Sequence, residues 1–159
     1  MINRSAGIEK PRWIVVGFQT DKTTTQEQNP AVFDNINLTS AFVKLNSDRY
    51  PVEEADVDFV TNDYVDFCDM ANEFKTEYYE FNNLIGGTQI DMINYKKLFP
   101  LIVFDVRHQS ELIKSNVMNI LLNFKFSVNV PVNTSMYVVM ISDRMMKLTS
   151  DGQTPMIAY

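Results

Sequence analysis

Short segments in which apolar and polar residues alternate constrain the fold of this chain more than any other feature. In residues 117–126, VMNILLNFKF, one face carries only apolar side chains: Met118, Ile120, Leu122, Phe124 and Phe126. Successive side chains of an extended strand point to opposite faces, so this segment predicts a strand with one buried face. Such a half-buried strand is typical of a β-sandwich.

Other segments also have the composition of strands. Residues 12–19, RWIVVGFQ, are rich in β-branched and aromatic side chains, and residues 39–46 alternate between apolar and polar positions. Residues 101–106, LIVFDV, form a nearly continuous apolar run, which is typical of a more fully buried strand. These segments predict a mainly β, antiparallel fold.

Residues 135–148, SMYVVMISDRMMKL, repeat the strand pattern after a short turn-forming sequence. We predict that they form the antiparallel neighbour of the strand at 117–126, joined to it through Pro131 and Asn133. The prediction is therefore a hairpin over residues 117–148.

In the middle of the chain, apolar residues recur with the period of a helix instead of the period of two that is typical of a strand. Apolar side chains between residues 64 and 81 recur every three or four positions: Tyr64, Phe67, Cys68, Ala71, Phe74, Tyr78 and Phe81. This spacing predicts an inserted amphipathic helix with Asp63 as its capping residue. We expect the aromatic stripe to pack on the sheet of the same chain; the alternative is that it faces a partner.

A chain of 159 residues is long enough for one domain with a sizeable core. We expect a single domain over residues 1–159, in which 1–11 is a lead-in segment and 149–159 a tail or last strand. The segments at 20–30 and 82–97 are expected to be loops because they are rich in polar residues and glycine.

The charge balance argues against direct binding to nucleic acid. The net charge is -6, and no cluster of lysine and arginine forms a basic track. The apolar runs are much shorter than the ~20 residues that span a bilayer, and the amino-terminal residues lack the apolar stretch of a secretory signal. We therefore expect no membrane segment and a protein made inside the host cell, not secreted.

Residues for catalysis are scarce. The chain has one histidine, His108, and one cysteine, Cys68. We expect His108 to be a solvated loop residue and Cys68 to be a small apolar member of the helical stripe. A metal site of histidines would need several of them, and no phosphate-binding glycine loop is present. The sequence thus predicts no catalytic residue and no cofactor.

One acidic stretch could still hold a cation. If residues 53–59 are extended, Glu54, Asp56 and Asp58 share one face, and three carboxylates suit a hard cation such as calcium. The same alternation sends Ala55, Val57 and Phe59 to the opposite face, so the stretch is also explained as a strand with a charged outer rim. We favour the second interpretation, because charge protects strand edges from unwanted pairing.

Several ordered pieces resemble one protein family. The pieces GFQTDK (17–22), LNSDRYP (45–51) and FPLIVFDV (99–106), with the aromatic helix between them, resemble the carboxy-terminal half of the double jelly-roll major capsid proteins of Polinton (Maverick) transposons and related viruses. The resemblance covers about residues 12–148. It implies a jelly-roll β-sandwich in the virion.

In that family two such domains share one polypeptide and three polypeptides form a trimer, so the resemblance also implies self-association and contact with other capsid proteins. This chain has the length of one domain, and we expect it to be half of such a subunit. A complete jelly roll has eight strands, whereas five or six are predicted here. The loops at 20–30 and 82–97 would then be candidates for contact between subunits or for the outer surface.

The expected function is therefore structural, without enzymatic activity. A first alternative is a host-domesticated module that binds a ligand or protein in a groove lined by Tyr78, Tyr79 and Phe81. A second is a hydrolase that uses the carboxylates of residues 53–58.

Overall fold

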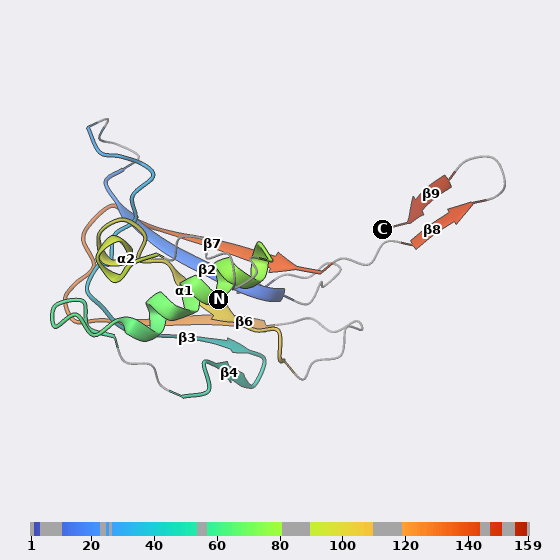
Figure 1. Ribbon diagram of the computed structural model, residues 1–159, viewed down its shortest axis with the longest axis horizontal. Coiled ribbons are helices and arrows are strands. Elements are labelled where there is room, and N and C mark those ends of the chain that lie inside the picture. Colours follow the sequence, from blue (N-terminus) through green and yellow to red (C-terminus); the bar gives the residue numbers. More distant parts are fainter. Residues whose placement is uncertain are drawn as a thin grey trace.

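The computed structural model describes the parts of the chain that carry its regular structure, namely residues 2–3, 11–22, 25, 27–53, 57–80, 90–109, 119–143, 147–150 and 155–158. Two antiparallel sheets form the body of the molecule (Figure 1). The first has the order β1-β6-β3-β4 and consists of β1 (Ile2–Asn3), β6 (Asn119–Phe126), β3 (Leu38–Leu45) and β4 (Asp48–Tyr50). The second has the order β5-β2-β7 and consists of β5 (Ile102–Asp105), β2 (Pro11–Thr20) and β7 (Thr134–Ser142). The predicted antiparallel sandwich is confirmed.

Two short strands close the chain. β8 (Lys147–Ser150) and β9 (Pro155–Ala158) pair only with each other, and Figure 1 draws this hairpin apart from both sheets. The strand predicted over 135–148 is therefore divided, because β7 ends at Ser142 and β8 begins at Lys147. Residues 149–159, which were expected to be a tail or last strand, contain the end of β8 and all of β9.

The two sheets meet through aromatic side chains. Phe18 of β2 points inward, and its ring packs edge-on against Phe124 and Phe126 of β6 at centroid distances of 5.3 Å and 5.9 Å. Ile14 and Val16, which share its face of β2, are fully buried. Alternation along β2 thus directs one row of side chains into the space between the sheets.

The outer face of β2 is covered as well. The Gln19 side chain donates hydrogen bonds to the carbonyl oxygens of Pro30 (2.6 Å) and Val32 (3.3 Å), which fastens the following loop to the sheet. Gly17 lies directly under Phe33, where a Cβ atom would come within 2.5 Å of the ring. The close approach of this loop therefore requires glycine.

The predicted helix is present as α1 (Val65–Tyr78), and it packs against β5. Its buried residues Phe67, Cys68 and Ala71 confirm that the stripe faces the sandwich of its own chain. The prediction that Asp63 caps it is wrong. Tyr64 occupies the N-cap position without a side-chain hydrogen bond, while the backbone of Asp63 bonds to that of Asp58.

A second, shorter helix was not predicted. α2 (Met92–Leu98) lies in the segment expected to be a loop, so that expectation is wrong for residues 92–97. The side chain of Asp91 accepts a hydrogen bond from the Asn94 amide at 2.8 Å and caps the helix. Seven residues with one buried side chain, Tyr95, show no periodicity that a pattern search could find.

The predicted hairpin over 117–148 is wrong. β6 pairs with β3 and β7 pairs with β2, so residues 127–133 carry the chain from one sheet to the other. Alternation shows that each segment is a strand but does not show which strand it pairs with. β4 was also missed, because its three residues were interpreted as turn formers; it forms a hairpin with β3 through Asn46, whose φ is 54°.

Among the described residues, no helix combines the length and apolar character needed to cross a membrane.

We expect Tyr95→Phe to lower the free energy of unfolding by about 1 to 2 kcal/mol. The buried Tyr95 hydroxyl donates a hydrogen bond to the Leu101 carbonyl oxygen at 2.8 Å, and the variant leaves that oxygen without this donor. Burial raises the pKa of Tyr95, so the hydroxyl keeps its proton. Urea denaturation monitored by circular dichroism measures the change. The matched control is Tyr137→Phe at an exposed position; equal effects of the two variants would contradict the prediction.

Candidate assembly interface

As far as the described residues show, the core of the sandwich is better covered on one side than on the other. Inward-facing side chains of β2, β3 and β5, such as Ile14, Val43 and Phe104, are fully buried. Inward-facing side chains of β6 and β7 are only partly buried where they pack against the same core, and Met136 at the start of β7 is exposed. We call this open flank the β6–β7 side; its inward-facing residues are Ile120, Leu122, Phe124, Phe126, Met136, Val138 and Met140.

Both strands of the β6–β7 side are sheet edges over most of their length. β7 ends the order β5-β2-β7, and among the described residues no strand pairs with its far edge. β6 has β3 on one edge, and on the other edge, within the part of the chain that the structure describes, β1 pairs with Asn119 and Ile120. Backbone N–H and C=O groups on such edges are available to another strand.

The outer face of β7 is also apolar. Tyr137 and Val139 are 42% and 57% exposed, and Met136 on the inner face is 45% exposed. The nine residues of β7, TSMYVVMIS, include no charged side chain. Proteins usually protect exposed edges with charged side chains or with proline, so this uncharged edge is a candidate contact surface.

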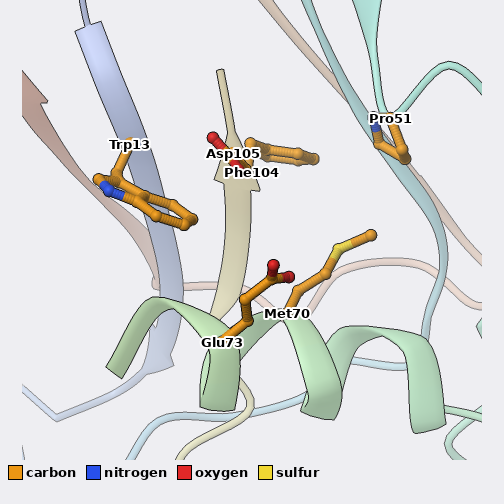
Figure 2. A pocket seen from close by; sticks show the side chains of 6 residues that line it. All are labelled: Trp13, Pro51, Met70, Glu73, Phe104 and Asp105. Atoms are coloured by element: carbon orange, nitrogen blue, oxygen red, sulfur yellow. The ribbon is translucent and has the colours of Figure 1, made fainter. Parts of the chain in front are cut away.

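The opposite flank is covered by α1, and a small pocket remains there. Figure 2 shows the side chains that line it, which come from β2, β5, α1 and the residue after β4: Trp13, Phe104, Asp105, Met70, Glu73 and Pro51. Its volume is about 140 Å³, below the roughly 300 Å³ of the smallest typical ligand pockets. The lining has two carboxylates but no histidine, cysteine or serine, so it provides no nucleophile with an adjacent base.

An ion-pair cluster beside this pocket joins α1 to β5. The guanidinium of Arg107 donates to both carboxylate oxygens of Asp105, at 3.0 Å and 2.8 Å, and pairs with Glu77 of α1. It also lies 4.4 Å from the Trp13 ring centroid. Burial tends to raise the pKa of Asp105, but the hydrogen bonds and charge of Arg107 outweigh it and hold that pKa below the usual range. A carboxylate held in its charged form serves as a structural clamp rather than as a general acid.

The tyrosines predicted to line a groove lie at the carboxyl end of α1. Tyr78 stacks on Phe74 at 5.2 Å, and Tyr79 meets Tyr78 edge-on at 5.1 Å. Both tyrosines are exposed. Phe81, the third predicted member, lies outside the described residues, and the groove stays a prediction.

The acidic stretch is only partly described. The side chain of Asp58 accepts hydrogen bonds from the backbone amides of Val60 (2.7 Å) and Thr61 (3.2 Å), and these bonds lower its pKa. Its carboxylate therefore stabilises a turn. Val57 and Phe59 are buried, as the alternation predicted, but Asp58 forms an isolated bridge with Asp63 rather than part of a strand.

Glu54 and Asp56, the other two residues of the candidate cation site, lie outside the described residues, so that site stays a prediction. Within the part of the chain that the structure describes, no three side chains of histidine, cysteine, aspartate or glutamate gather to hold a metal ion.

The two other candidates for chemistry lie where the sequence predicted. Cys68 lies on the buried face of α1, and its thiol donates to the Ile90 carbonyl oxygen at 3.6 Å. Burial raises the pKa of this thiol, and the nearby charges of Asp69 and Asp91 raise it further, so it stays protonated. His108 is exposed in the turn after β5.

Comparison with known proteins gives one match. A family model described as a double jelly roll-like domain matches residues 1–146. No curated protein and no solved structure matches the chain significantly.

Asp58→Ala should lower the melting temperature at neutral pH, because the amides of Val60 and Thr61 lose their acceptor. A carboxylate whose pKa is lowered by folding stabilises the protein above its unfolded pKa, here 3.8, and this contribution is lost as pH falls through the folded pKa. The difference between wild type and variant should therefore shrink below pH 3.8. Thermal melts across a pH series test this, with the exposed Asp63→Ala as control. A difference that stayed constant down to roughly pH 2 would contradict the assignment.

Proposed function

The chain belongs to the double jelly roll-like domain family, and on that premise we propose that it is a structural protein whose jelly-roll β-sandwich takes part in building a capsid-type shell. In this proposal the domain acts through contacts between subunits and catalyses no reaction. Self-association is its principal binding activity.

The observation that carries this proposal is the open β6–β7 side. Among the described residues, β7 is an edge strand of its sheet, β6 is paired with β1 only at its start, and apolar side chains of both strands pack on the core while only partly buried. Burying apolar surface contributes roughly 25 cal/mol per Å², so a partner that covered this flank would gain substantial free energy from it. A subunit of a shell needs such a surface on its flank, whereas an enzyme needs a concave site with reactive groups.

The charged groups that the structure describes support the same function. Asp105, Arg107 and Glu77 tie α1 to the sheet, and Asp58 holds a turn. The contacts of these four side chains stabilise the fold, so their positions are explained without a catalytic role. Lys22 likewise pairs with Asp34 at 3.0 Å and fastens the loop after β2.

The resemblance to Polinton-type major capsid proteins supports a more specific proposal. Its most telling pieces, 17–22, 45–51 and 99–106, correspond to the end of β2 with the two residues after it, the β3–β4 hairpin, and β5 with the residues that flank it. All three shape the sandwich. We extend the proposal accordingly: residues 1–159 are one jelly-roll domain of a two-domain subunit, which forms a homotrimer, joins other capsid proteins and resides in the virion.

The proposal predicts that a longer version of the protein, including whatever the native reading frame encodes upstream of Met1, forms trimers in solution and shell-like particles at high concentration. Light scattering gives the mass, and electron microscopy of negatively stained samples shows the particles. A longer form that remained monomeric and bound a small ligand saturably would overturn the proposal and favour the ligand-binding alternative.

A second prediction concerns the acidic stretch. Because the proposal assigns it neither a metal nor a reaction, the double variant Glu54→Ala/Asp56→Ala should keep the oligomeric mass of the wild type. Adding a chelator should likewise leave the melting temperature unchanged, since a bound cation would stabilise the folded state. A fall in melting temperature with chelator, restored by calcium, would support the cation site instead.

A further inference from the structure

We propose that the pocket beside α1 binds the side chain of a lysine from a neighbouring protein molecule, with the lysine ammonium group between the carboxylates of Glu73 and Asp105. The inference deepens the proposed assembly function, because it names one contact by which the subunit recognises a protein partner, and it rests on that function for its biological role. The affinity for an alkylammonium group is argued from the pocket itself.

The size and the apolar walls of the pocket suit the stem of such a side chain. Trp13 and Phe104 are 4% and 1% exposed, and Met70 and Pro51 complete the apolar lining. Figure 2 shows these side chains around one common space. The volume of about 140 Å³ corresponds to roughly four or five water molecules, each of which takes about 30 Å³ of the liquid. The four-carbon stem and terminal nitrogen of lysine have a similar size.

Negative charge is in excess at this pocket. Figure 2 shows the carboxylate of Glu73 extending from α1 toward Asp105 of β5. Arg107 pairs with Asp105 and with Glu77, so one guanidinium serves two carboxylates and neutralises only one negative charge. Within the part of the chain that the structure describes, the side chain of Glu73 has no hydrogen bond or ion pair. A recess with this charge balance favours a cation.

The aromatic wall adds a second attraction for a cation. A cation within about 6 Å of the centroid of a tryptophan ring is attracted by the electrons of its face. The Trp13 ring already takes part in one such contact, because the Arg107 guanidinium lies 4.4 Å from its centroid. An ammonium group that enters the pocket meets the same kind of surface together with the carboxylate of Glu73.

A bound metal ion explains the pocket less well. Calcium takes six to eight oxygen ligands, whereas the lining provides the carboxylates of Glu73 and Asp105 and is otherwise apolar. No group of three potential metal-binding side chains occurs among the described residues. An ammonium group on an alkyl stem uses both parts of the lining, since its charge contacts the carboxylates and its methylene groups contact the apolar walls.

The shape of the pocket favours a side chain of a protein over a larger free ligand. Its volume is below that of typical small-molecule pockets. It also reaches the surface, because Glu73 is exposed while Trp13 and Phe104 behind it are buried. Single side chains that fill pockets of this kind are the usual anchors of protein interfaces. We therefore assign the pocket to a lysine that projects from a partner protein.

Binding is measured through Trp13, which is the only tryptophan of the chain, so its fluorescence reports on the pocket. Titration with n-butylammonium at constant ionic strength should give a saturable change with a dissociation constant in roughly the millimolar range. 1-Butanol has the same stem without the charge and should bind at least about fivefold more weakly. No saturable change with n-butylammonium, or equal binding of the two compounds, would overturn the assignment.

A pair of variants locates the bound charge. Glu73→Gln should raise the dissociation constant of n-butylammonium by roughly fivefold. Glu80→Gln removes the same charge just beyond the end of α1, outside the pocket lining, and should leave the constant unchanged. Both positions are exposed, and circular dichroism melts verify that both variants fold. Equal effects of the two variants would show that the amine responds only to the overall charge, which contradicts a site at the pocket.

A peptide distinguishes a lysine of a protein from a free amine. A blocked glycine-lysine-glycine tripeptide should compete with n-butylammonium, whereas the same tripeptide with norleucine, which lacks the ammonium group, should not. If n-butylammonium binds and the lysine peptide does not compete, the pocket takes a free alkylamine and the assignment to a protein partner is overturned.

The outcomes also separate this inference from the proposed shell function. Competition by the lysine peptide in a protein whose longer form never assembles would uphold the pocket and overturn the shell function. Particles of the longer form that assemble while n-butylammonium does not bind would uphold the shell function and overturn the pocket. Because the lysine contact belongs to the assembly, Glu73→Gln in the longer form should weaken it, and assembly equal to that of the wild type would overturn that role of the pocket.

Discussion

Strand β2 is the constraint on which the rest of the structure depends, because both its edges and both its faces are occupied. β5 and β7 pair with its edges. Phe18 on its inner face joins the two sheets through the rings of β6. On its outer face, Gly17 lies under Phe33, and Trp13 meets Phe74 of α1 at 5.2 Å. A strand enclosed in this way cannot shift by one residue without moving polar groups into the core and apolar groups out of it.

The two flanks of the sandwich differ because the chain uses its helices on only one of them. α1 packs on β5, α2 contacts α1 and is anchored by the buried ring of Tyr95, and Arg107 pairs with both Glu77 of α1 and Asp105 of β5. Among the described residues, the other flank has β1 beside β6, and β7 is paired only with β2. An uncharged edge with half-buried apolar side chains is costly for a monomer in water. That asymmetry connects the fold to the proposed function, in which assembly would cover the apolar side chains that folding leaves exposed.

Prediction from the sequence succeeded for elements in which the spacing of apolar residues matches the side that is buried in the folded protein. The alternation in β6, the apolar run of β5 and the three-to-four spacing of α1 each reflect burial by a single neighbouring layer. It failed for β4 and α2, which are too short to show a period. It also failed for Asp63, because the backbone of that residue pairs with Asp58 instead of its side chain capping the helix. Within the acidic stretch, the turn made by Asp58 depends on hydrogen bonds to backbone amides, which no side-chain pattern records.

The sequence by itself determined that this chain forms an antiparallel sandwich, that a helix is inserted near residues 64–81, and that the net charge is negative. These properties follow from composition and from periods of two and 3.6 residues, which each segment carries independently of its neighbours. Only the tertiary structure decided that residues 127–133 cross between sheets and that β6 and β7 lie on one open flank. Strand pairing is a long-range choice that depends on which faces and edges remain free once the other strands have packed. The interface is therefore a property of the assembled sandwich and of no single segment.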